Sequence, residues 1–376
     1  MPARKRTILF SGMLAGDPGQ GGATWAVLQY LLGLRRLGHD VYLVEPVKIL
    51  GDSVIDYFRL VTAEFGLDAN AALIEAGSRQ TVGTSYDKLH DVAARADVLI
   101  NVSGMLADPA LIDRIPTRVY LDLDPAFVQL WHATQGVDMR LDAHTHFVTV
   151  GQAIGRPGCA VPTCGRAWIG TLPPVVLEHW PGGQARTNGA FTTVANWRGY
   201  GSIEHDGVRY GQKAHSLRQL IDLPTRTREE FLLALSIHPD ERSDLAALRQ
   251  NGWRLIDPVE AAGSPDRYRR FVQRSLGEFG LAKEGYVVSR CGWFSDRSAC
   301  YLASGVPVIA QDTGFGEFIP TGEGLLSFRT TEDVLVAMDR LRSDPARHSA
   351  AARTLAAEWF DSDRVLTRLL DAVGVT

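Results

Sequence analysis

Short apolar runs alternate with longer amphipathic stretches along most of the chain. Apolar, β-branched runs of this length predict buried strands, and the amphipathic stretches between them predict helices. The stretch 23–38 has apolar residues at helical spacing and ends on Gly38, which suits a helix C-terminus. Strand, helix and strand in this order predict a parallel sheet covered by helices, so the expected fold class is α/β. In the first half the predicted strands are 7–12, 40–45, 98–104, 118–124 and 146–151.

The same pattern stops and then starts again in the second half. Residues 173–189 contain three prolines and three glycines without periodicity, which predicts a linker between two domains. The strands predicted after it are 190–196, 230–237, 253–257, 286–290, 306–310 and 324–328. We therefore expect two doubly wound, Rossmann-like domains that face each other across a cleft, where such folds bind ligands. The expected boundaries are 1–180, 181–350, and 351–376 for C-terminal helices that pack back toward the first domain.

Composition narrows the class of protein further. The chain has 376 residues, enough for two domains, and its hydrophobic content of 45% is ordinary for a folded protein. Four cysteines are too few for a disulfide scaffold, so free thiols and a cytoplasmic location are expected. No run approaches the roughly 18 apolar residues of a membrane span. The 39 lysines and arginines do not outnumber the 43 aspartates and glutamates, which predicts that nucleic acid is not a partner. The composition indicates no oligomeric state.

A glycine-rich loop follows the first predicted strand. Its sequence GDPGQGGA, residues 16–23, brings Gly21 and Gly22 to the start of the following helix. Free backbone N–H groups and the positive end of the helix dipole can bind an anion there, so this loop is a candidate for contact with a phosphate or a sugar. A plain glycine-rich turn is an equally good interpretation, because the spacing does not match the dinucleotide-binding motif.

The segment 289–318 combines charge, hydroxyl groups and glycines after a predicted strand. The strand is expected to end at Arg290, a turn follows at Gly292 and Trp293, and a helix begins with Ser295, Asp296, Arg297 and Ser298. Hydroxyls, a guanidinium and N-terminal amides in one place suit a diphosphate. The simpler alternative is that Asp296 only caps the helix and that Trp293 belongs to the core.

Two aspartates near the end of the strand 118–124 are candidates for proton transfer. Asp122 and Asp124 alternate along the strand, so both side chains point to one face. Asp124 is our candidate for the general base. It could equally be the N-cap of the helix that follows Pro125. We expect no metal site, because the cysteine spacing does not fit zinc and no convincing carboxylate cluster is visible.

Several segments resemble known families of glycosyltransferases. RCGWFS (290–295) resembles the HCGWNS opening of the nucleotide-sugar box in plant secondary-product glycosyltransferases. VPVIAQDTGFGEFIPTGEGLLSF (306–328) is similar to a segment of the retaining, glycogen-synthase-like glycosyltransferases. So are NWRGYG and YGQK (196–213) and GQGGATWAVLQYLLGLRRLGHDVYLV (19–44). The segments occur in the order expected for these enzymes, so the chain resembles a GT-B fold glycosyltransferase.

The resemblance implies transfer of a sugar from a nucleoside-diphosphate sugar, held by the second domain, to a small-molecule or glycan acceptor, held by the first. Arg198 and Lys213 match the basic pair that neutralises the donor diphosphate, which implies catalysis without a metal and without any cofactor besides the nucleotide sugar. Gly314, Gly316 and Glu317 match the loop that holds the donor sugar. The predicted catalytic residues are then Asp124, Arg198 and Lys213, with Gly21 and Gly22 at a donor phosphate or the acceptor. The predicted donor-binding residues are Arg290, Gly292, Trp293, Ser295, Asp296, Arg297, Ser298, Gly314, Gly316 and Glu317.

The chain departs from the retaining family at two positions. That family carries two glutamates eight positions apart, and Gly292 and Cys300 occupy their places here. Asp296 is therefore the candidate for the ribose contact that a glutamate would make. The missing pair keeps two alternatives open: a nucleotide-sugar 2-epimerase, or a non-catalytic protein that binds a nucleotide sugar.

Overall fold

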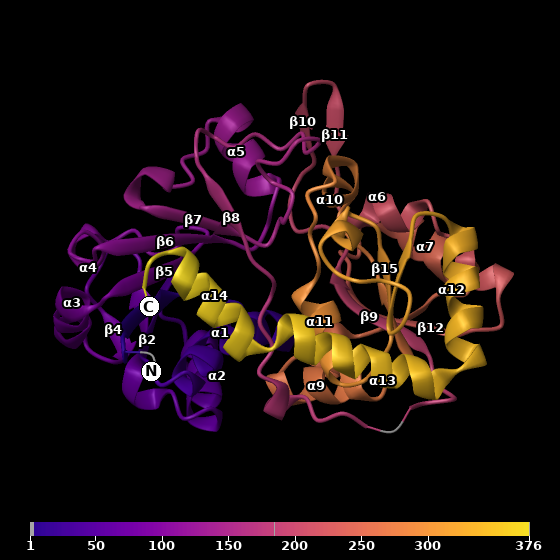
Figure 1. The fold of residues 1–376 in the computed structure, drawn as a ribbon, viewed down its shortest axis with the longest axis horizontal. Coiled ribbons are helices and arrows are strands. Elements are labelled where there is room, and N and C mark those ends of the chain that lie inside the picture. The colour runs from indigo at the N-terminus through magenta and orange to yellow at the C-terminus, as the bar shows by residue number, and fades with distance from the viewer. Residues whose placement is uncertain (1–3, 184, 376) are drawn as a thin grey trace.

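Two parallel β-sheets, each covered by helices, form two halves of a computed structural model that describes residues 4–183 and 185–375 (Figure 1). The first sheet has eight strands in the order β4-β3-β2-β1-β5-β6-β7-β8, of which only the edge strand β4 is antiparallel to its neighbour. Its strands are β1 (Thr7–Ser11), β2 (Asp40–Val47), β3 (Ala71–Glu75), β4 (Thr81–Gly83), β5 (Val98–Val102), β6 (Thr117–Asp122), β7 (His146–Thr149) and β8 (Trp168–Gly170). The helices between them are α1 (Gly21–Arg36), α2 (Asp52–Glu64), α3 (Tyr86–Arg95), α4 (Pro109–Ile112) and α5 (Phe127–Gln135).

The second sheet has six strands, all parallel, in the order β13-β12-β9-β14-β15-β16. They are β9 (Phe191–Asn196), β12 (Phe231–Ser236), β13 (Arg254–Ile256), β14 (Gly277–Gly280), β15 (Val308–Gln311) and β16 (Leu325–Phe328). A separate antiparallel hairpin is formed by β10 (Ile203–His205) and β11 (Val208–Tyr210). The helices of this half are α6 (Lys213–Arg218), α7 (Arg242–Gln250), α8 (Pro258–Ala262), α9 (Pro265–Gln273), α10 (Glu284–Ser289), α11 (Asp296–Ala303), α12 (Thr331–Ser343) and α13 (Pro345–Leu355).

The strand order confirms the expected α/β fold class with two doubly wound sheets. In the first sheet the chain builds outward from β1 through β2 and β3, then returns to the other side of β1 with β5. The second sheet repeats this from β9, with β12 on one side and β14 on the other. The points where the order reverses lie at the carboxyl ends of these strands, which is where open α/β sheets bind ligands.

The predicted strand 286–290 is wrong, and the strands that were not predicted are β3, β4, β8, β10, β11 and β14. Residues 286–290 were expected to form a strand, but they belong to α10 and its end at Arg290, which has a left-handed φ of 47°. The strand in this region is the glycine-containing β14. A Cβ on Gly277 would lie 2.7 Å from the Phe191 ring, so packing against the neighbouring strand requires glycine here and overrides the low strand propensity.

The chain crosses between the two halves twice. The first crossing follows β8, and the second leads from α13 through the π-helical turn Ala356–Phe360 to α14 (Ser362–Ala372). The two crossing segments lie side by side: Val175 N–H donates to the Phe360 carbonyl oxygen at 2.7 Å, and Ser362 N–H donates to that of Val175 at 2.9 Å. The helix α14 then packs on α1, where a Cβ on Gly33 would lie 2.5 Å from Leu366. Both chain ends therefore lie in the first half (Figure 1).

The apolar core is continuous across the junction. One cluster includes Trp25 of α1, Trp180 of the first crossing, Tyr268 of α9 and Phe294 before α11. The Trp25 and Trp180 rings lie 5.0 Å apart, and the Trp25 indole N–H donates to the Pro265 carbonyl oxygen at 2.8 Å. The junction below the cleft is thus packed like the interior of a single domain. None of the described helices is long and apolar enough to cross a membrane.

Candidate functional site

A cavity of about 360 Å³ lies between the two halves. The first half contributes the glycine-rich loop, from Asp17 to Ala23. The second half contributes Asn196 and Ser236 at the carboxyl ends of β9 and β12, together with Lys213, Asp296 and Arg297 at the starts of α6 and α11. The cavity therefore occupies the edge of the second sheet where ligands of such folds bind.

Lys213 brings an unpaired positive charge to this cavity. It is the first residue of α6, a helix whose start is fixed by reciprocal hydrogen bonds between Gln212 and His215. Burial, together with the nearby positive charges of Arg297 and Lys283, lowers the pKa of Lys213 to about 7. Lys213 forms no hydrogen bond or ion pair with any residue that the structure describes. A negatively charged ligand would supply the missing partner.

Arg297 is held on one side and open on the other. Its Nε donates to Oε1 of the fully buried Glu278 at 2.5 Å, and its Nη1 donates to the Val194 carbonyl oxygen at 3.1 Å. Its Nη2 is buried and has no hydrogen-bond partner among the described residues. Burial alone lowers the pKa of Arg297, but the Glu278 carboxylate raises it overall. The guanidinium is therefore charged and oriented before any ligand arrives.

The glycine-rich loop is anchored by a buried glutamate. Glu45 accepts hydrogen bonds from the backbone N–H groups of Ala15 at 2.9 Å and Gly16 at 2.6 Å. Burial raises the pKa of Glu45 to about 7 in spite of these bonds. Gly22 lines the cavity, whereas Gly21 lies at the junction, where a Cβ would meet the Ser264 carbonyl oxygen at 2.2 Å. Gly21 thus allows the close approach of the two halves and does not line the cavity.

Asp296 lies between this cavity and a second one. The second cavity has a volume of about 220 Å³ and is also lined by residues of both halves, including Tyr30 of α1, Leu123, Trp293 and Phe294. Asp296 lines both cavities, and it makes no hydrogen bond or ion pair to a described residue. Its side chain does not cap α11, which begins at this residue. Asp296 is therefore available to a ligand on either side.

Asp124, the candidate base, is engaged in a contact between the two halves. Its carboxylate lies 2.9 Å from the Lys283 ammonium and also accepts hydrogen bonds from the hydroxyls of Tyr200 and Tyr286. Burial and the Asp124 charge raise the pKa of both tyrosines. Both hydroxyls therefore stay protonated and donate hydrogen bonds to this carboxylate. Asp124 is not the N-cap of α5, which begins after Ala126. Asp122 is fully buried and accepts from Gln129 and Thr149.

Several predicted site residues are not brought into either cavity. Arg198 pairs with Glu241 at 2.5 Å, and Arg290 pairs with Glu317 at 3.1 Å and with Asp312 at 3.5 Å. Each of these arginines already has a carboxylate partner on the surface of the second half. The remaining ones are Ser295 and Ser298, buried in the first turn of α11, and Gly292, Gly314 and Gly316 in the loops around it. The structure brings together Gly22, Lys213, Asp296 and Arg297 in the first cavity, and Trp293 and Asp296 in the second.

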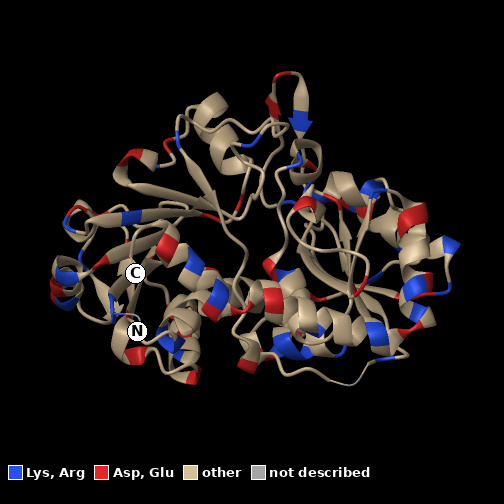
Figure 2. Ribbon diagram, viewed as in Figure 1, with Lys and Arg blue, Asp and Glu red and all other residues tan. Residues whose placement is uncertain are grey.

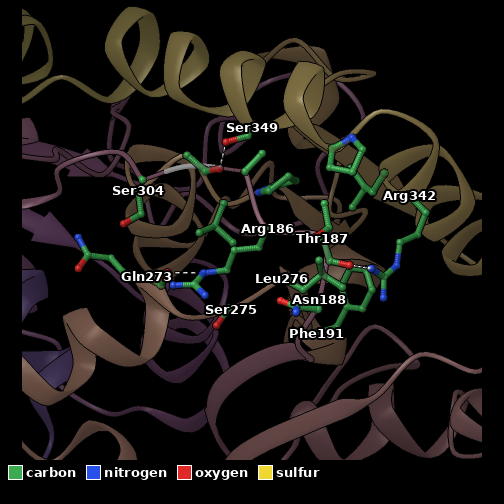
Figure 3. Close-up of a pocket in the computed structure, with 17 residues that line it drawn as sticks. Arg186, Thr187, Asn188, Phe191, Gln273, Ser275, Leu276, Ser304, Arg342 and Ser349 are labelled. Carbon is green, nitrogen blue, oxygen red and sulfur yellow. Dashed lines mark hydrogen bonds between the residues drawn. The ribbon is translucent and has the colours of Figure 1, made fainter.

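A larger cavity, of about 480 Å³, lies at the opposite edge of the second sheet (Figure 3). It adjoins the amino ends of β9 and β14, and Arg186, Arg342 and Ser349 point into it. These polar groups are already satisfied: Arg186 Nε donates to the Gln273 carbonyl oxygen at 3.1 Å, and Arg342 Nε donates to Glu229 at 2.7 Å. Ser349 Oγ donates to the Gly305 carbonyl oxygen at 2.6 Å. The smaller cavities between the halves, with their unpaired groups, are the stronger candidates for a functional site.

Sequence patterns could not have identified four of the residues that shape the site. Glu278 lies in the missed strand β14, and Asn196 and Ser236 are single polar residues at strand ends. Tyr30 belongs to the apolar stripe of α1 and resembles a core residue. Within the described residues, no group of three or more His, Cys, Asp or Glu side chains is arranged to hold a metal ion.

Comparison with known proteins identifies the fold. No family model and no curated protein sequence matches the chain. Among solved structures, it is similar to an alpha-glucosyltransferase in complex with UDP and a 13-mer DNA containing an HMU base, with a TM-score of 0.63, 12% identity, and coverage of 98% of this chain and 100% of that one. It is similar to Anabaena HepE in complex with UDP and glucose, with a TM-score of 0.60, 12% identity and coverage of 99% and 100%. AviGT4, a glycosyltransferase involved in avilamycin A biosynthesis, matches with a TM-score of 0.56, 13% identity and coverage of 98% and 97%. The chain has the GT-B fold over its whole length.

These comparisons correct one expectation from composition. The charge balance predicted that nucleic acid is not a partner, but four structures of an alpha-glucosyltransferase with the same fold are in complex with DNA. The exclusion is wrong because net charge is a sum over the whole chain, whereas phosphate contacts depend on local groups of arginine and lysine. Figure 2 shows residues of both signs spread over both halves, so the total of -4 says little about any one surface.

Proposed function

We propose that this protein transfers a sugar from a nucleoside-diphosphate sugar, bound in the 360 Å³ cavity, to an acceptor that approaches from the first half. One observation carries the proposal: Lys213 and Arg297 Nη2 both line the cavity and both lack a partner among the described residues. Two such groups at a helix start suit the two phosphates of a nucleoside diphosphate. On the far side of the cavity, Pro258, Val259 and Tyr268 offer apolar surface for the nucleoside.

The same groups would lower the barrier of the transfer. The bond between the anomeric carbon and the phosphate oxygen breaks with its electron pair on the diphosphate, and a bond forms to the acceptor oxygen, which loses its proton. Negative charge therefore grows on the leaving diphosphate. Fixed positive groups that meet this charge stabilise the transition state more than the ground state. The Glu278 contact supports this role, because it orients Arg297 in advance.

We extend the proposal to the nucleotide, the metal requirement and the location. Proteins of the same fold are solved with UDP or UDP-glucose, so UDP is the first nucleotide to test. Lys213 and Arg297 supply positive charge where other transferases use a divalent ion, so transfer is proposed to persist in EDTA. Four free cysteines support a reducing, cytoplasmic location.

A thermal-shift panel of the purified protein with UDP, GDP, dTDP, ADP and CMP, each with magnesium and with EDTA, tests the proposal. A nucleotide at about 100 times its Kd should add roughly 2.7 kcal/mol to the unfolding free energy, which is readily seen as a higher Tm. The expected result is a shift with one nucleoside diphosphate that survives EDTA and disappears in Arg297→Met. The absence of a shift with any nucleotide would refute the proposal.

The same panel decides the role of Arg198. If Arg198 contacts the diphosphate as its motif implies, Arg198→Ala will remove the shift as Lys213→Met does. If the Glu241 ion pair describes its role, Arg198→Ala will leave the shift in place. Comparing the two variants therefore decides whether Arg198 contacts the diphosphate, as the motif implies, or only pairs with Glu241.

A further inference from the structure

The 220 Å³ cavity is lined on every side by apolar groups, with few exceptions. Ala26, Leu123 and Val150 come from the first half, Pro173 and Pro174 from the first crossing, and Phe294 from the second half. Its volume is below the roughly 300–1,000 Å³ that is typical of sites for drug-sized ligands. A cavity of this size and lining fits a small ring or the ring-bearing end of a larger molecule.

Tyr30 places an unsatisfied hydroxyl in this cavity. Its side chain is only 2% exposed, and its hydroxyl has no hydrogen-bond partner among the residues that the structure describes. Burial, and then the charge of Asp296, raise the pKa of Tyr30 far above its usual value, so the hydroxyl keeps its proton. A buried hydroxyl without a partner destabilises a fold, and because Tyr30 also lines a cavity, a ligand atom there can pair with it.

Asp296 connects this cavity to the proposed donor site. It lines both cavities, has no partner of its own, and directly precedes Arg297. A hydroxyl placed between Tyr30 and Asp296 would therefore lie next to the donor diphosphate. Tyr30 would donate a hydrogen bond to that hydroxyl, and the Asp296 carboxylate would accept its proton.

The other polar side chains leave little capacity for more hydroxyl groups. Gln29 already makes two hydrogen bonds away from the cavity residues: Oε1 accepts from Val176 N–H at 2.7 Å, and Nε2 donates one of its two hydrogens to Cys300 Sγ at 3.7 Å. The Trp293 ring packs on Tyr286 with ring centres 4.5 Å apart. A monosaccharide would bury several hydroxyls here without partners, whereas a ring with one hydroxyl would not.

We propose, on the basis of the function proposed above, that this cavity is the acceptor site and that it takes an apolar ring compound with one reactive hydroxyl, such as a phenol. The acceptor oxygen attacks the anomeric carbon of the donor, its proton passes to the Asp296 carboxylate, and the electron pair of the broken bond leaves with the nucleoside diphosphate. Asp296 later releases the proton to solvent. Atoms and charge balance without any further reactant.

The test uses 4-methylumbelliferone and 4-nitrophenol as phenol probes and glucose and maltose as sugar probes. Each is offered with the nucleotide sugar whose nucleotide gives the thermal shift. The wild type is expected to glycosylate the phenols and to leave the sugars unchanged. Tyr30→Phe should raise the KM for the phenol roughly tenfold, the usual effect of one lost hydrogen bond.

A matched control variant is available in the same half. Tyr120 is also a buried tyrosine whose hydroxyl has no partner among the described residues, and it lines neither cavity. Tyr120→Phe should therefore leave the KM for the phenol unchanged. Asp296→Asn should lower kcat by roughly 100-fold or more, as expected for a lost general base. The Kd for the nucleotide, measured by calorimetry, reports on the donor site in every variant.

The outcomes separate this inference from the proposed function. If a nucleotide binds and its sugar is transferred or hydrolysed, but no phenol is glycosylated, the acceptor assignment is wrong and the transferase assignment stands. An equal rise in KM in Tyr30→Phe and Tyr120→Phe would also overturn the acceptor assignment, because the effect would then be structural. If no nucleoside diphosphate binds, both proposals fall together.

Discussion

The cavities between the two halves are distinguished by single residues that the fold leaves unsatisfied. The Lys213 ammonium, Arg297 Nη2, the Tyr30 hydroxyl and the Asp296 carboxylate all lack a partner among the described residues. Burying such groups opposes folding, and a ligand that pairs with them recovers the lost free energy. The protein should therefore gain stability and lose binding when Lys213 or Tyr30 is made apolar, whereas Arg297 also balances the charge of the buried Glu278.

Replacing Lys213 with methionine tests whether stability rises while ligand binding is lost. Burial and the nearby Arg297 and Lys283 lower the pKa of Lys213 from 10.5 to about 7. Below pH 7 the lysine is charged in both the folded and the unfolded chain, so the folded state carries the full cost of the buried charge. As the pH rises from 7 toward 10.5, the folded chain loses this proton first and the cost fades. We expect Lys213→Met to stabilise the nucleotide-free protein by about 1–3 kcal/mol at pH 6 and by little at pH 10.5, as measured by urea unfolding.

The control for this variant is Lys88→Met, because Lys88 lies on α3 and donates to the Ala69 carbonyl oxygen at 2.9 Å, away from both cavities. It should leave nucleotide binding unchanged. Wild-type nucleotide affinity in Lys213→Met would contradict the diphosphate assignment.

The residues of the candidate site that the sequence predicted lie in local patterns. The residues that it missed depend on partners far away along the chain. Lys213, Asp296 and Arg297 each begin a helix after a loop, a local pattern that a sequence reveals. Arg198 belongs to the same motif as Lys213, but its partner Glu241 is 43 residues away. No local sequence pattern predicts an ion pair over that distance. Tyr30 was missed for the same reason, since its role depends on Asp296, far along the chain.

At the scale of elements, the start of α1 is shaped by the helix that faces it. Gly21 begins α1, and a Cβ there would lie 2.2 Å from the carbonyl oxygen of Ser264, just before α9. In an isolated helix, alanine would be favoured over glycine by about 1 kcal/mol. We expect Gly21→Ala to lower the unfolding free energy by about 2–4 kcal/mol instead, because the backbones must separate. Chemical denaturation measures the difference.

Gly51→Ala provides the comparison. Gly51 precedes α2, its φ is -83°, and nothing lies within 4 Å of an added Cβ. This variant should change the unfolding free energy by no more than roughly 0.5 kcal/mol. Similar losses in both variants would show that the close approach of α1 and α9 does not matter to stability.

The glycine-rich loop depends on Glu45, and this gives a second pH-dependent expectation. Burial raises the pKa of Glu45 from 4.5 to about 7, so the folded chain holds this proton more tightly than the unfolded chain. The contribution of Glu45 to stability is thus fully present below pH 4.5 and is lost as the pH rises through about 7. Relative to the wild type, Glu45→Gln should gain on the order of 2 kcal/mol between pH 4.5 and pH 8 in urea unfolding, because glutamine does not titrate.

Glu204 is exposed on β10, and Glu204→Gln is the surface control for this substitution. A constant difference between Glu45→Gln and the wild type across this range would mean that Glu45 titrates normally. The nucleotide Kd of Glu45→Gln, measured at pH 8, then reports whether the loop still lines the cavity.

Many elements could be predicted from periodicity. Two exceptions, β14 and residues 286–290, are explained by tertiary packing. C-terminal helices were expected over 351–376, and this range contains the end of α13 and all of α14. The strand β14 was missed because Gly277 and Gly280 fit close neighbours rather than strand propensity. Residues 286–289 are helical in spite of the two valines among them, and Tyr286 contacts Asp124 in the other half. Tertiary packing decided both cases.

At the scale of the whole molecule, the two halves touch on both sides of the cavities. Below lies the continuous core around Trp25 and Trp180. Above, α5 meets the β10–β11 hairpin and α10 (Figure 1). There the Lys283 ammonium lies 4.4 Å from the centre of the Tyr200 ring and 5.0 Å from that of Phe127, besides its ion pair with Asp124. Aromatic rings and a carboxylate around one ammonium make this upper contact specific.

Breaking the upper contact should loosen the molecule without unfolding it. Asp124→Ala leaves the partly buried Lys283 ammonium without its carboxylate, so we expect a loss of about 1–3 kcal/mol in unfolding free energy. The radius of gyration of the nucleotide-free protein, from small-angle scattering, should rise. The double variant Asp124→Ala with Lys283→Met should lose less than the sum of the single variants, because the unpaired charge is gone. Additive losses and an unchanged radius would show that this pair does not hold the halves together.

The two crossings of the chain also determine how the halves can move. A single connection would let one half swivel in any direction about the other. Here the two crossing segments run side by side and are hydrogen-bonded to each other through Val175, Phe360 and Ser362, so together they form one hinge. Twisting is blocked, and only rotation about one axis remains. Since displacement grows with distance from that axis, a small change of angle at these three residues becomes the largest movement at Asp124 and Lys283, on the far side of the two cavities.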